Sequence, residues 1–163
     1  MTARRDSEWF ELPDPTGLTD TGEKGLRFAC TQCGNCCSGP PGFVGFTDEE
    51  AGAIAGLLGL TKERFYERYT RDTVRGRTII DIKPAGSPHG YDCVFLDRDT
   101  VPGKAVCGIY HARPAQCRTW PFWGSNLTSR AMWNAASKNC PGMNTGTLHP
   151  PKHIRITRDR VDI

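Results

Sequence analysis

The feature that most constrains this chain is a cysteine motif, C-x2-C-x2-C-C, formed by Cys30, Cys33, Cys36 and Cys37. Two cysteines separated by two residues can turn both sulfurs toward one metal ion, and zinc knuckles and iron–sulfur loops both use this spacing. The prolines and glycines within residues 28–46 argue against a regular helix in this segment. We therefore expect a loop whose thiolates bind metal.

The adjacent cysteines, Cys36 and Cys37, are the unusual part of the motif. Neighbouring side chains in an extended or turning chain tend to point apart, so that both seldom reach one ion. The pair therefore predicts a loop that serves two centres, or a sulfur that bridges two metal ions. Two alternatives stay open: one ligand beside a spare buried thiol, and a vicinal disulfide, which is strained and needs an oxidising setting.

Four further cysteines, Cys93, Cys107, Cys117 and Cys140, stand singly in the second half of the chain. Eight thiolates in total fit two four-thiolate sites, and a closed site of this kind is structural or electron-transferring rather than hydrolytic. Spacing does not separate zinc from iron. The proline after Cys140, as in bacterial ferredoxin loops, favours an iron–sulfur cluster over Zn²⁺ by a small margin, with two metal centres as one arrangement.

The same cysteines could instead form disulfides, which persist mainly outside the reducing cytoplasm. No apolar run follows Arg4 and Arg5, and the longest apolar-and-glycine run, residues 51–60, is too short to span a bilayer. We therefore expect a cytoplasmic protein whose cysteines bind metal ions. The formal net charge of +3 is too mild to indicate nucleic acid, and no membrane partner is expected.

Gly 18 and Pro 12 in 163 residues indicate many loops. We predict the α+β class: a small, loop-rich, metal-stapled single domain with short helices and short strands. The capping box of Thr47 and Glu50 predicts one helix and Thr61 the start of a second. Pro114 predicts a short helix running toward Cys117, and residues 129–138 a further one.

Strands are predicted at residues 78–83 and 94–96, and the alternating tail from His153 to Asp162 predicts an edge strand. The expected organisation is an irregular N-terminal arm over 1–27, a cysteine-cluster metal-binding domain over 28–142 and a C-terminal extension over 143–163. Within the arm, Trp9, Phe10 and Leu12 either anchor the segment to the body or belong to a mobile tail.

The ordered motifs resemble one known family, the CxxCxxCC cysteine-cluster proteins, also called YkgJ-like. The resemblance is carried by C-x2-C-x2-C-C, by Cys-Val-Phe-Leu at 93–96, by Cys-Gly-Ile-Tyr-His-Ala-Arg-Pro-Ala-Gln-Cys-Arg-Thr-Trp-Pro-Phe at 107–122 and by Cys-Pro-Gly at 140–142. It implies a zinc- or iron-chelating domain with the eight cysteines as metal ligands. One branch resembles flagellin lysine N-methylases, but the sequence lacks a glycine-rich strand–turn–helix for S-adenosylmethionine.

Residues around the last motifs are candidates for support of the thiolates. Arg113 and Arg118 are expected to offset thiolate charge and donate hydrogen bonds to sulfur, although Arg113 could instead pair with a carboxylate. The aromatic residues near 120–123 are interpreted as core. The histidines are interpreted as surface or loop residues rather than ligands, and Pro150 and Pro151 exclude a single helix through His149 and His153.

The working hypothesis is a cysteine-rich metal-chelating protein that binds an iron–sulfur or related cluster and serves electron transfer or redox sensing. One alternative is a zinc-stabilised structural or interaction module without redox activity. A second is an accessory domain of a protein-modifying, N-methylase-like enzyme. The sequence contains no catalytic constellation, phosphate loop or nucleophile elbow, which favours a protein that is not an enzyme by itself.

Overall fold

The structure is a computed structural model that describes residues 8–12 and 24–163. Its contacts divide the chain into two compact units. Unit 1 joins the described part of Met1–Thr31 to Pro121–Ile163, and unit 2 is Gln32–Trp120. Both consist of short helices and short antiparallel strands, so the predicted α+β class is confirmed. The boundaries predicted at 27/28 and 142/143 stay a prediction.

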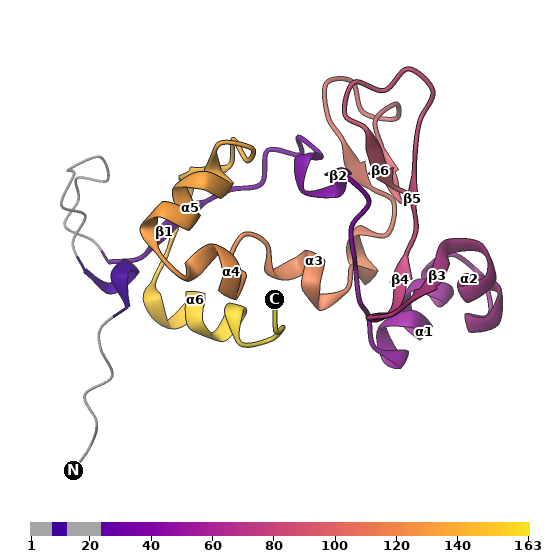
Figure 1. The fold of residues 1–163 in the computed structure, drawn as a ribbon, viewed down its shortest axis with the longest axis horizontal. Helices are drawn as coiled ribbons and strands as arrows, with labels where there is room; N and C mark the ends of the chain where they lie inside the picture. The colour runs from indigo at the N-terminus through magenta and orange to yellow at the C-terminus, as the bar shows by residue number, and fades with distance from the viewer. Residues whose placement is uncertain (1–7, 13–23) are drawn as a thin grey trace, which may run out of the picture. The chain divides into compact units, whose positions relative to one another are not determined.

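Unit 2 begins with the cysteine loop and continues through two helices and several short strands (Figure 1). In chain order its helical elements are the 3-10 turn η2 (Asn35–Cys37), α1 (Asp48–Leu57), α2 (Lys62–Tyr69), the 3-10 turn η3 (Tyr110–Ala112) and α3 (Ala115–Thr119). Its strands are β2 (Ser38–Gly39), β3 (Thr70–Thr73), β4 (Gly76–Ile79), β5 (Asp81–Ile82), β6 (Tyr91–Cys93), β7 (Leu96–Asp97) and β8 (Val106–Cys107).

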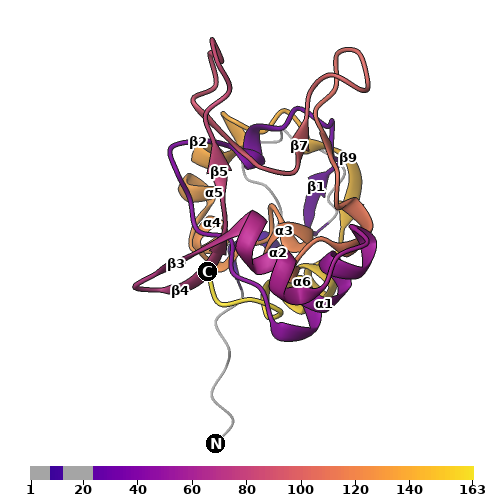
Figure 2. The ribbon, with the colours of Figure 1, turned by 90° about the vertical axis from the view of Figure 1, so that its right-hand side faces the viewer.

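The strands of unit 2 form three small antiparallel sheets, ordered β2-β6-β5, β3-β4 and β7-β8. The β3–β4 hairpin projects as an arm (Figure 2). The strand predicted at 78–83 is divided at Ile80, where its partner changes: the Ile80 amide donates to the carbonyl of Tyr69 next to β3, and the Ile80 carbonyl accepts from the amide of Val94 after β6. The strand predicted at 94–96 is wrong at Val94 and Phe95, which form the turn between β6 and β7, and only Leu96 lies in a strand.

The predicted helices of unit 2 are confirmed. The Thr47 hydroxyl accepts from the amide of Glu50 at 3.1 Å while the Glu50 carboxylate accepts from the amide of Thr47, the reciprocal bonds of a capping box. Thr61 caps α2. The apolar faces of both helices meet β4 and the turn after β6 in one buried cluster: Ala51, Ile54, Ala55, Phe65, Ile79, Phe95 and Ile109.

Unit 1 is built from segments at the two ends of the described chain. Its elements are the 3-10 turn η1 (Trp9–Glu11), β1 (Leu26–Phe28), α4 (Gly124–Leu127), α5 (Arg130–Ser137), β9 (Met143–His149) and α6 (Pro151–Arg158). Strands β1 and β9 pair antiparallel with a bulge after Arg27. The helix predicted at 129–138 is confirmed as α5, capped by Ser129.

The predicted edge strand at the tail is wrong, because residues 151–158 form helix α6. Pro151 lies in the first helical turn, where its missing N–H is not needed, and Ile154 and Thr157 are buried three residues apart on one face. Two arginines of the alternating pattern form ion pairs from this helix. Arg155 pairs with Glu11 and Arg158 pairs with Glu8.

The segment around η1 is anchored rather than free. Phe10 is 2% exposed, and the Trp9 indole N–H donates to the carbonyl of Leu127 at 2.7 Å. Leu12 does not take part in the same way, since it is half exposed. Trp9 and Phe10 therefore belong to the core of unit 1, and the anchoring alternative holds for these two residues.

Candidate metal centre

The C-x2-C-x2-C-C loop is shaped by a turn at Gly34. This residue has φ +76°, and an added Cβ would lie 2.6 Å from the Cβ of Ala105, so that only glycine fits. The turn lets the Cys37 amide donate to the Gly34 carbonyl at 3.0 Å and closes η2. The Ser38 hydroxyl donates to the same carbonyl at 2.7 Å. Residues 28–46 contain this 3-10 turn but no α-helix, as predicted.

The turn brings the adjacent thiols together. The Sγ atoms of Cys36 and Cys37 lie 3.7 Å apart. The expectation that neighbouring side chains point apart is wrong here, because the tight η2 turn replaces the extended backbone on which that expectation rests. Two sulfurs on one tetrahedral metal at about 2.3 Å are about 3.8 Å apart. The observed spacing therefore suits chelation of a single ion by both residues.

Three other thiols are carried by the strands and helix of unit 2. Cys93 ends β6, and Cys107 ends β8 opposite Leu96. Cys117 lies in α3, the short helix predicted after Pro114. In the β2–β6 ladder, Ser38 pairs with Asp92, which brings the end of the cysteine loop to the end of β6. The pairing of Ser38 with Asp92 joins residues more than fifty positions apart.

The thiols of unit 2 perturb one another's ionisation. Burial, followed by the charges of neighbouring thiols, raises the pKa of Cys93 to about 11 and that of Cys117 to about 12. Burial also raises the pKa of Cys107. The hydrogen bond with Cys37 lowers the pKa of Cys36 to about 7, whereas the same hydrogen bond and burial raise the pKa of Cys37. These five thiols therefore share one electrostatic neighbourhood.

The electrostatic neighbourhood of these thiols is not by itself a closed set of metal ligands. Within residues 8–12 and 24–163, no three His, Cys, Asp or Glu side chains stand together as metal ligands. All eight cysteines lie in the described residues, and none of them forms a disulfide. The chemistry of the donors nevertheless suits zinc or iron–sulfur clusters, since thiolate is a preferred ligand of both and a bound metal drives thiol deprotonation.

The remaining cysteines are divided between the units. Cys33 belongs to unit 2, where its charge, together with that of Cys37, acts on Arg98. Cys30 and Cys140 belong to unit 1. They lie at the same end of the β1–β9 ladder, because Phe28 pairs with Met143 and the amide of Ala29 donates to the carbonyl of Gly142.

The two predicted arginines have different surroundings. The Arg113 guanidinium stacks on Tyr110 at 3.9 Å from the ring centroid, and its charge lowers the pKa of Cys36, Cys107 and Cys117 in opposition to burial. Arg118 instead contacts a carboxylate, with its Nη2 3.5 Å from Oε1 of Glu50. Arg113 therefore lies in the electrostatic neighbourhood of the thiols, whereas Arg118 contacts a carboxylate. The predicted support of the thiolates by these two arginines stays a prediction.

Sequence reasoning missed the ion pair of Asp92 and Arg98. Asp92 is buried, at 3% exposure, directly before Cys93. Arg98 holds its carboxylate in a fork, with Nε 2.8 Å from Oδ2 and Nη2 2.9 Å from Oδ1. This hydrogen bond lowers the pKa of Asp92 more than burial raises it. The available signal was an acidic residue directly before a cysteine. If that segment is a buried strand, the acid needs a basic partner nearby.

Of the aromatic residues near 120–123 and the histidines, unit 1 contains Phe122, Trp123, His149 and His153. Phe122 is 3% exposed and stacks on Trp133 with centroids 5.9 Å apart, as expected of core. His149 and His153 do not share a helix, as predicted. The turn at Pro150 still places their rings 5.0 Å apart, and His149 Nε2 lies 3.1 Å from the carbonyl oxygen of Phe28.

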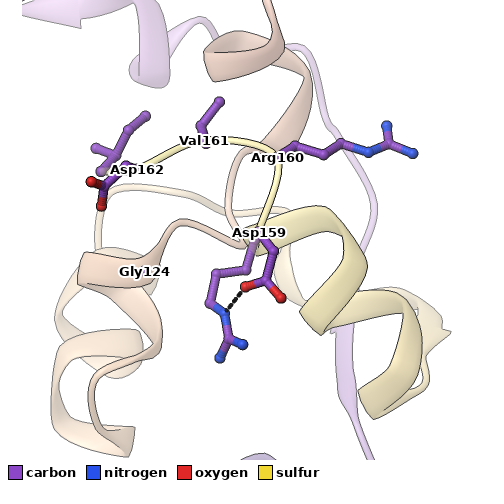
Figure 3. Close-up of a pocket in the computed structure, with 7 residues that line it drawn as sticks. Gly124, Asp159, Arg160, Val161 and Asp162 are labelled. Atoms are coloured by element: carbon purple, nitrogen blue, oxygen red, sulfur yellow. Dashed lines mark hydrogen bonds and ion pairs between the residues drawn. The ribbon is translucent and has the colours of Figure 1, made fainter.

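A surface cavity of about 550 Å³ also lies in unit 1 (Figure 3). Its lining is Gly124 and residues 158–163, which carry charges of both signs. Arg158 donates to Asp159 across one side of it. None of the eight cysteines lines this cavity, so that it is separate from the thiol site.

The described chain is thus a small α+β protein with six of its eight cysteines in unit 2. It belongs to the CxxCxxCC family, whose model, described as "Putative zinc- or iron-chelating domain", matches residues 29–141. No solved structure matches the chain. In the part that the structure describes, no helix combines the length and apolar character needed to cross a membrane.

Proposed function

We propose that the thiols of unit 2 bind an iron–sulfur or related metal cluster and that the protein serves electron transfer or redox sensing. The observation that carries the proposal is the shared neighbourhood of Cys36, Cys37, Cys93, Cys107 and Cys117. One tetrahedral ion takes four thiolates. Unit 2 contains six cysteines, which exceed that number and favour a centre with more than one metal ion.

The chain's own residues support such a centre in three ways. The η2 turn holds Cys36 and Cys37 at the sulfur spacing of two ligands on one metal. Arg113 supplies positive charge near Cys36, Cys107 and Cys117, which favours their thiolate forms. The buried apolar cluster packs against Cys93 and Cys107 and keeps water from that side. An iron–sulfur cluster, when bound, supplies one-electron redox chemistry.

A second candidate is a zinc-stabilised module without redox activity. It is favoured by the packing of Cys93 and Cys107 against the apolar cluster of α1, α2 and β4. A metal bound there joins the cysteine loop to the core and contributes its binding energy to folding. The same four-thiolate chemistry fits both candidates, so that the metal itself decides between them.

The test is anaerobic purification of the full chain, followed by metal analysis, sulfide analysis and visible absorption. The proposal predicts iron, labile sulfide and a brown charge-transfer band. Colourless protein with about two zinc ions per chain would overturn it and support the zinc module. Cys36→Ser and Cys37→Ser are each expected to lower metal content, with Ser87→Ala, on the loop before β6, as the control. Full loading of either cysteine variant would remove that residue from the ligand set.

A further inference from the structure

We propose that Arg98 is a positioning residue for the metal site, which clamps the C-x2-C-x2-C-C loop to strand β6 and places a positive charge beside Cys33 and Cys37. This inference rests on the proposed function, because the clamp acts on thiols that we assign to the metal. Its evidence is nevertheless independent of any bound metal: a set of hydrogen bonds, a strand register and a close approach to a glycine.

The clamp consists of one guanidinium and two partners. Asp92 accepts from Nε and Nη2 of Arg98 at 2.8 and 2.9 Å, and the Ser38 hydroxyl accepts from the same Nη2 at 2.6 Å. Ser38 in turn donates to the carbonyl of Gly34 at 2.7 Å. One connected network therefore runs from the buried carboxylate beside Cys93 to the turn inside the cysteine motif.

The register of the sheet explains why this network bears on the thiols. Ser38 pairs with Asp92 across β2 and β6, and the pairing is antiparallel. The residues that continue this register by one position are Cys37 and Cys93. The clamp therefore fixes the rung directly beside two of the candidate ligands, and a change in the clamp shifts their spacing.

Arg98 also approaches the loop itself. A Cβ on Gly34 would lie 3.3 Å from Nη1 of Arg98, so that the guanidinium lies against the turn between Cys33 and Cys36. The pKa of Arg98 is raised by its hydrogen bond to Asp92 and further by the charges of Cys37 and Cys33. This effect shows that the arginine and the two thiols act on one another electrostatically.

The planar fork of arginine is the part that lysine cannot replace. A guanidinium binds both carboxylate oxygens and still donates to a hydroxyl, whereas an ammonium is a single point charge. Arg98→Lys therefore retains the charge but loses the simultaneous hold on Asp92 and Ser38. Arg98→Gln loses both. Comparing the two variants separates positioning from simple charge compensation.

Unit 2 also contains a matched control for the clamp. Arg77 holds Asp72 in the same fork, at 2.8 and 2.9 Å, on the β3–β4 hairpin. The Asp72 side chain is 74% exposed and the Asp92 side chain is 3% exposed. Arg77→Gln therefore removes an arginine of equal charge and geometry that contacts no residue of the cysteine loop's network.

The experiment titrates the reduced, metal-free full chain with Co²⁺, whose tetrahedral thiolate complexes absorb visibly. We expect Arg98→Gln and Arg98→Lys to weaken Co²⁺ binding at least about tenfold and to shift the absorption bands, as changes beside metal ligands do. Arg77→Gln is expected to match wild type. Wild-type affinity in Arg98→Gln would overturn the clamp, and full rescue by Arg98→Lys would replace positioning with charge compensation.

A second measurement needs no metal. In the reduced chain, hydrogen exchange of the Cys37 amide, which donates to the Gly34 carbonyl, is expected to accelerate several-fold in Arg98→Gln and in Ser38→Ala, which removes the hydrogen bonds of Ser38 to Arg98 and to Gly34 and preserves the Asp92 ion pair. Unchanged rates in both variants would overturn the clamp. If purification finds colourless zinc protein, the proposed function fails, while this second measurement still decides whether Arg98 positions the loop.

Discussion

The two units of the chain are held together in different ways. Unit 1 has a core of large aromatic side chains: Trp133, Phe122 and Phe10 are all at 3% exposure or less. Its seven-residue strand β9 pairs with β1. Unit 2 has an apolar cluster around α1 and α2, but the strands that carry its cysteines are two or three residues long.

The distribution of cysteines follows this difference. Unit 2 contains six of the eight, and unit 1 contains only Cys30 and Cys140. Strand pairs as short as β7 and β8 are not stable alone. Unit 2 therefore combines very short strand pairs with most of the thiols, and the proposed metal would contribute most to stability there.

Metal removal is expected to have the largest effect, and to act on one unit. Anaerobic treatment with a strong chelator in the presence of reductant should increase the hydrogen-exchange rates of β6 and β8 amides at least about a hundredfold. The reason is that a ligand present at about 100 times its Kd shifts the folding equilibrium by about that factor, and removal of the ligand reverses the shift. Amides of α5 and β9 in unit 1 should keep most of their protection. Equal loss of protection in both units would contradict the comparison.

The next test destabilises unit 1 instead. Trp133→Ala removes a side chain that is 1% exposed, stacks on Phe122 and donates to Asn144 at 2.8 Å. We expect a loss of about 3–5 kcal/mol in the stability of unit 1. Hydrogen exchange of β9 measures the loss of stability. Metal analysis should find that the metal content of the protein is unchanged.

Met132→Ala is the matched control for this substitution. Met132 precedes Trp133 in α5 and is 48% exposed, so its loss should change stability by less than about 0.5 kcal/mol. A fall in metal content with Trp133→Ala would show that the metal depends on the core of unit 1, and the contrast between the units would then be wrong.

The sequence predicted the elements whose signals are local. The capping box of Thr47 and Glu50 and the cap at Ser129 each act within one helical turn, and both helices form where predicted. The strand predicted for the C-terminal tail is wrong because that prediction relied on the alternation of apolar and charged residues. Pro151, whose position suits the start of a helix, was the better signal. The strand prediction failed at Val94 because an apolar run does not distinguish a strand from a turn that packs against a core, and Val94 lies in such a turn.

The candidate site was predictable as a list of donors but not as an arrangement. The motif alone identifies Cys36 and Cys37, whereas their 3.7 Å spacing depends on the η2 turn. The division of cysteines between units depends on the β1–β9 ladder, which joins residues over one hundred positions apart. Arg98 was missed because its partners, Asp92 and Ser38, are brought together only by the register of the sheet.

A glycine pair tests whether the turn of the cysteine loop shapes the site. Gly34→Ala combines a positive φ with a Cβ 2.6 Å from that of Ala105, and we expect a loss of about 1–3 kcal/mol together with reduced metal content. Gly59→Ala is the control, because Gly59 also has a positive φ, +66°, but its Cβ would meet nothing within 4 Å.

The control glycine separates backbone strain from the shape of the loop. Gly59→Ala should cost about 1 kcal/mol through strain alone and leave metal content unchanged. Thermal unfolding and metal analysis measure both effects. If Gly34→Ala binds metal as fully as Gly59→Ala, the turn at Gly34 does not set the positions of the thiols.

The smallest expected effect is a pH dependence confined to unit 1. Partial burial, with the charges of His149 and Arg160, lowers the pKa of His153 below its usual 6.5. The unfolded chain then binds more protons than the folded one as pH falls through 6.5, so this contribution to stability is present above that pH and lost below it. Exchange of α6 amides should therefore accelerate slightly more between pH 7.5 and 5.5, after correction for intrinsic rates, in wild type than in His153→Gln. An identical profile in the variant would show that His153 carries no proton-linked stability.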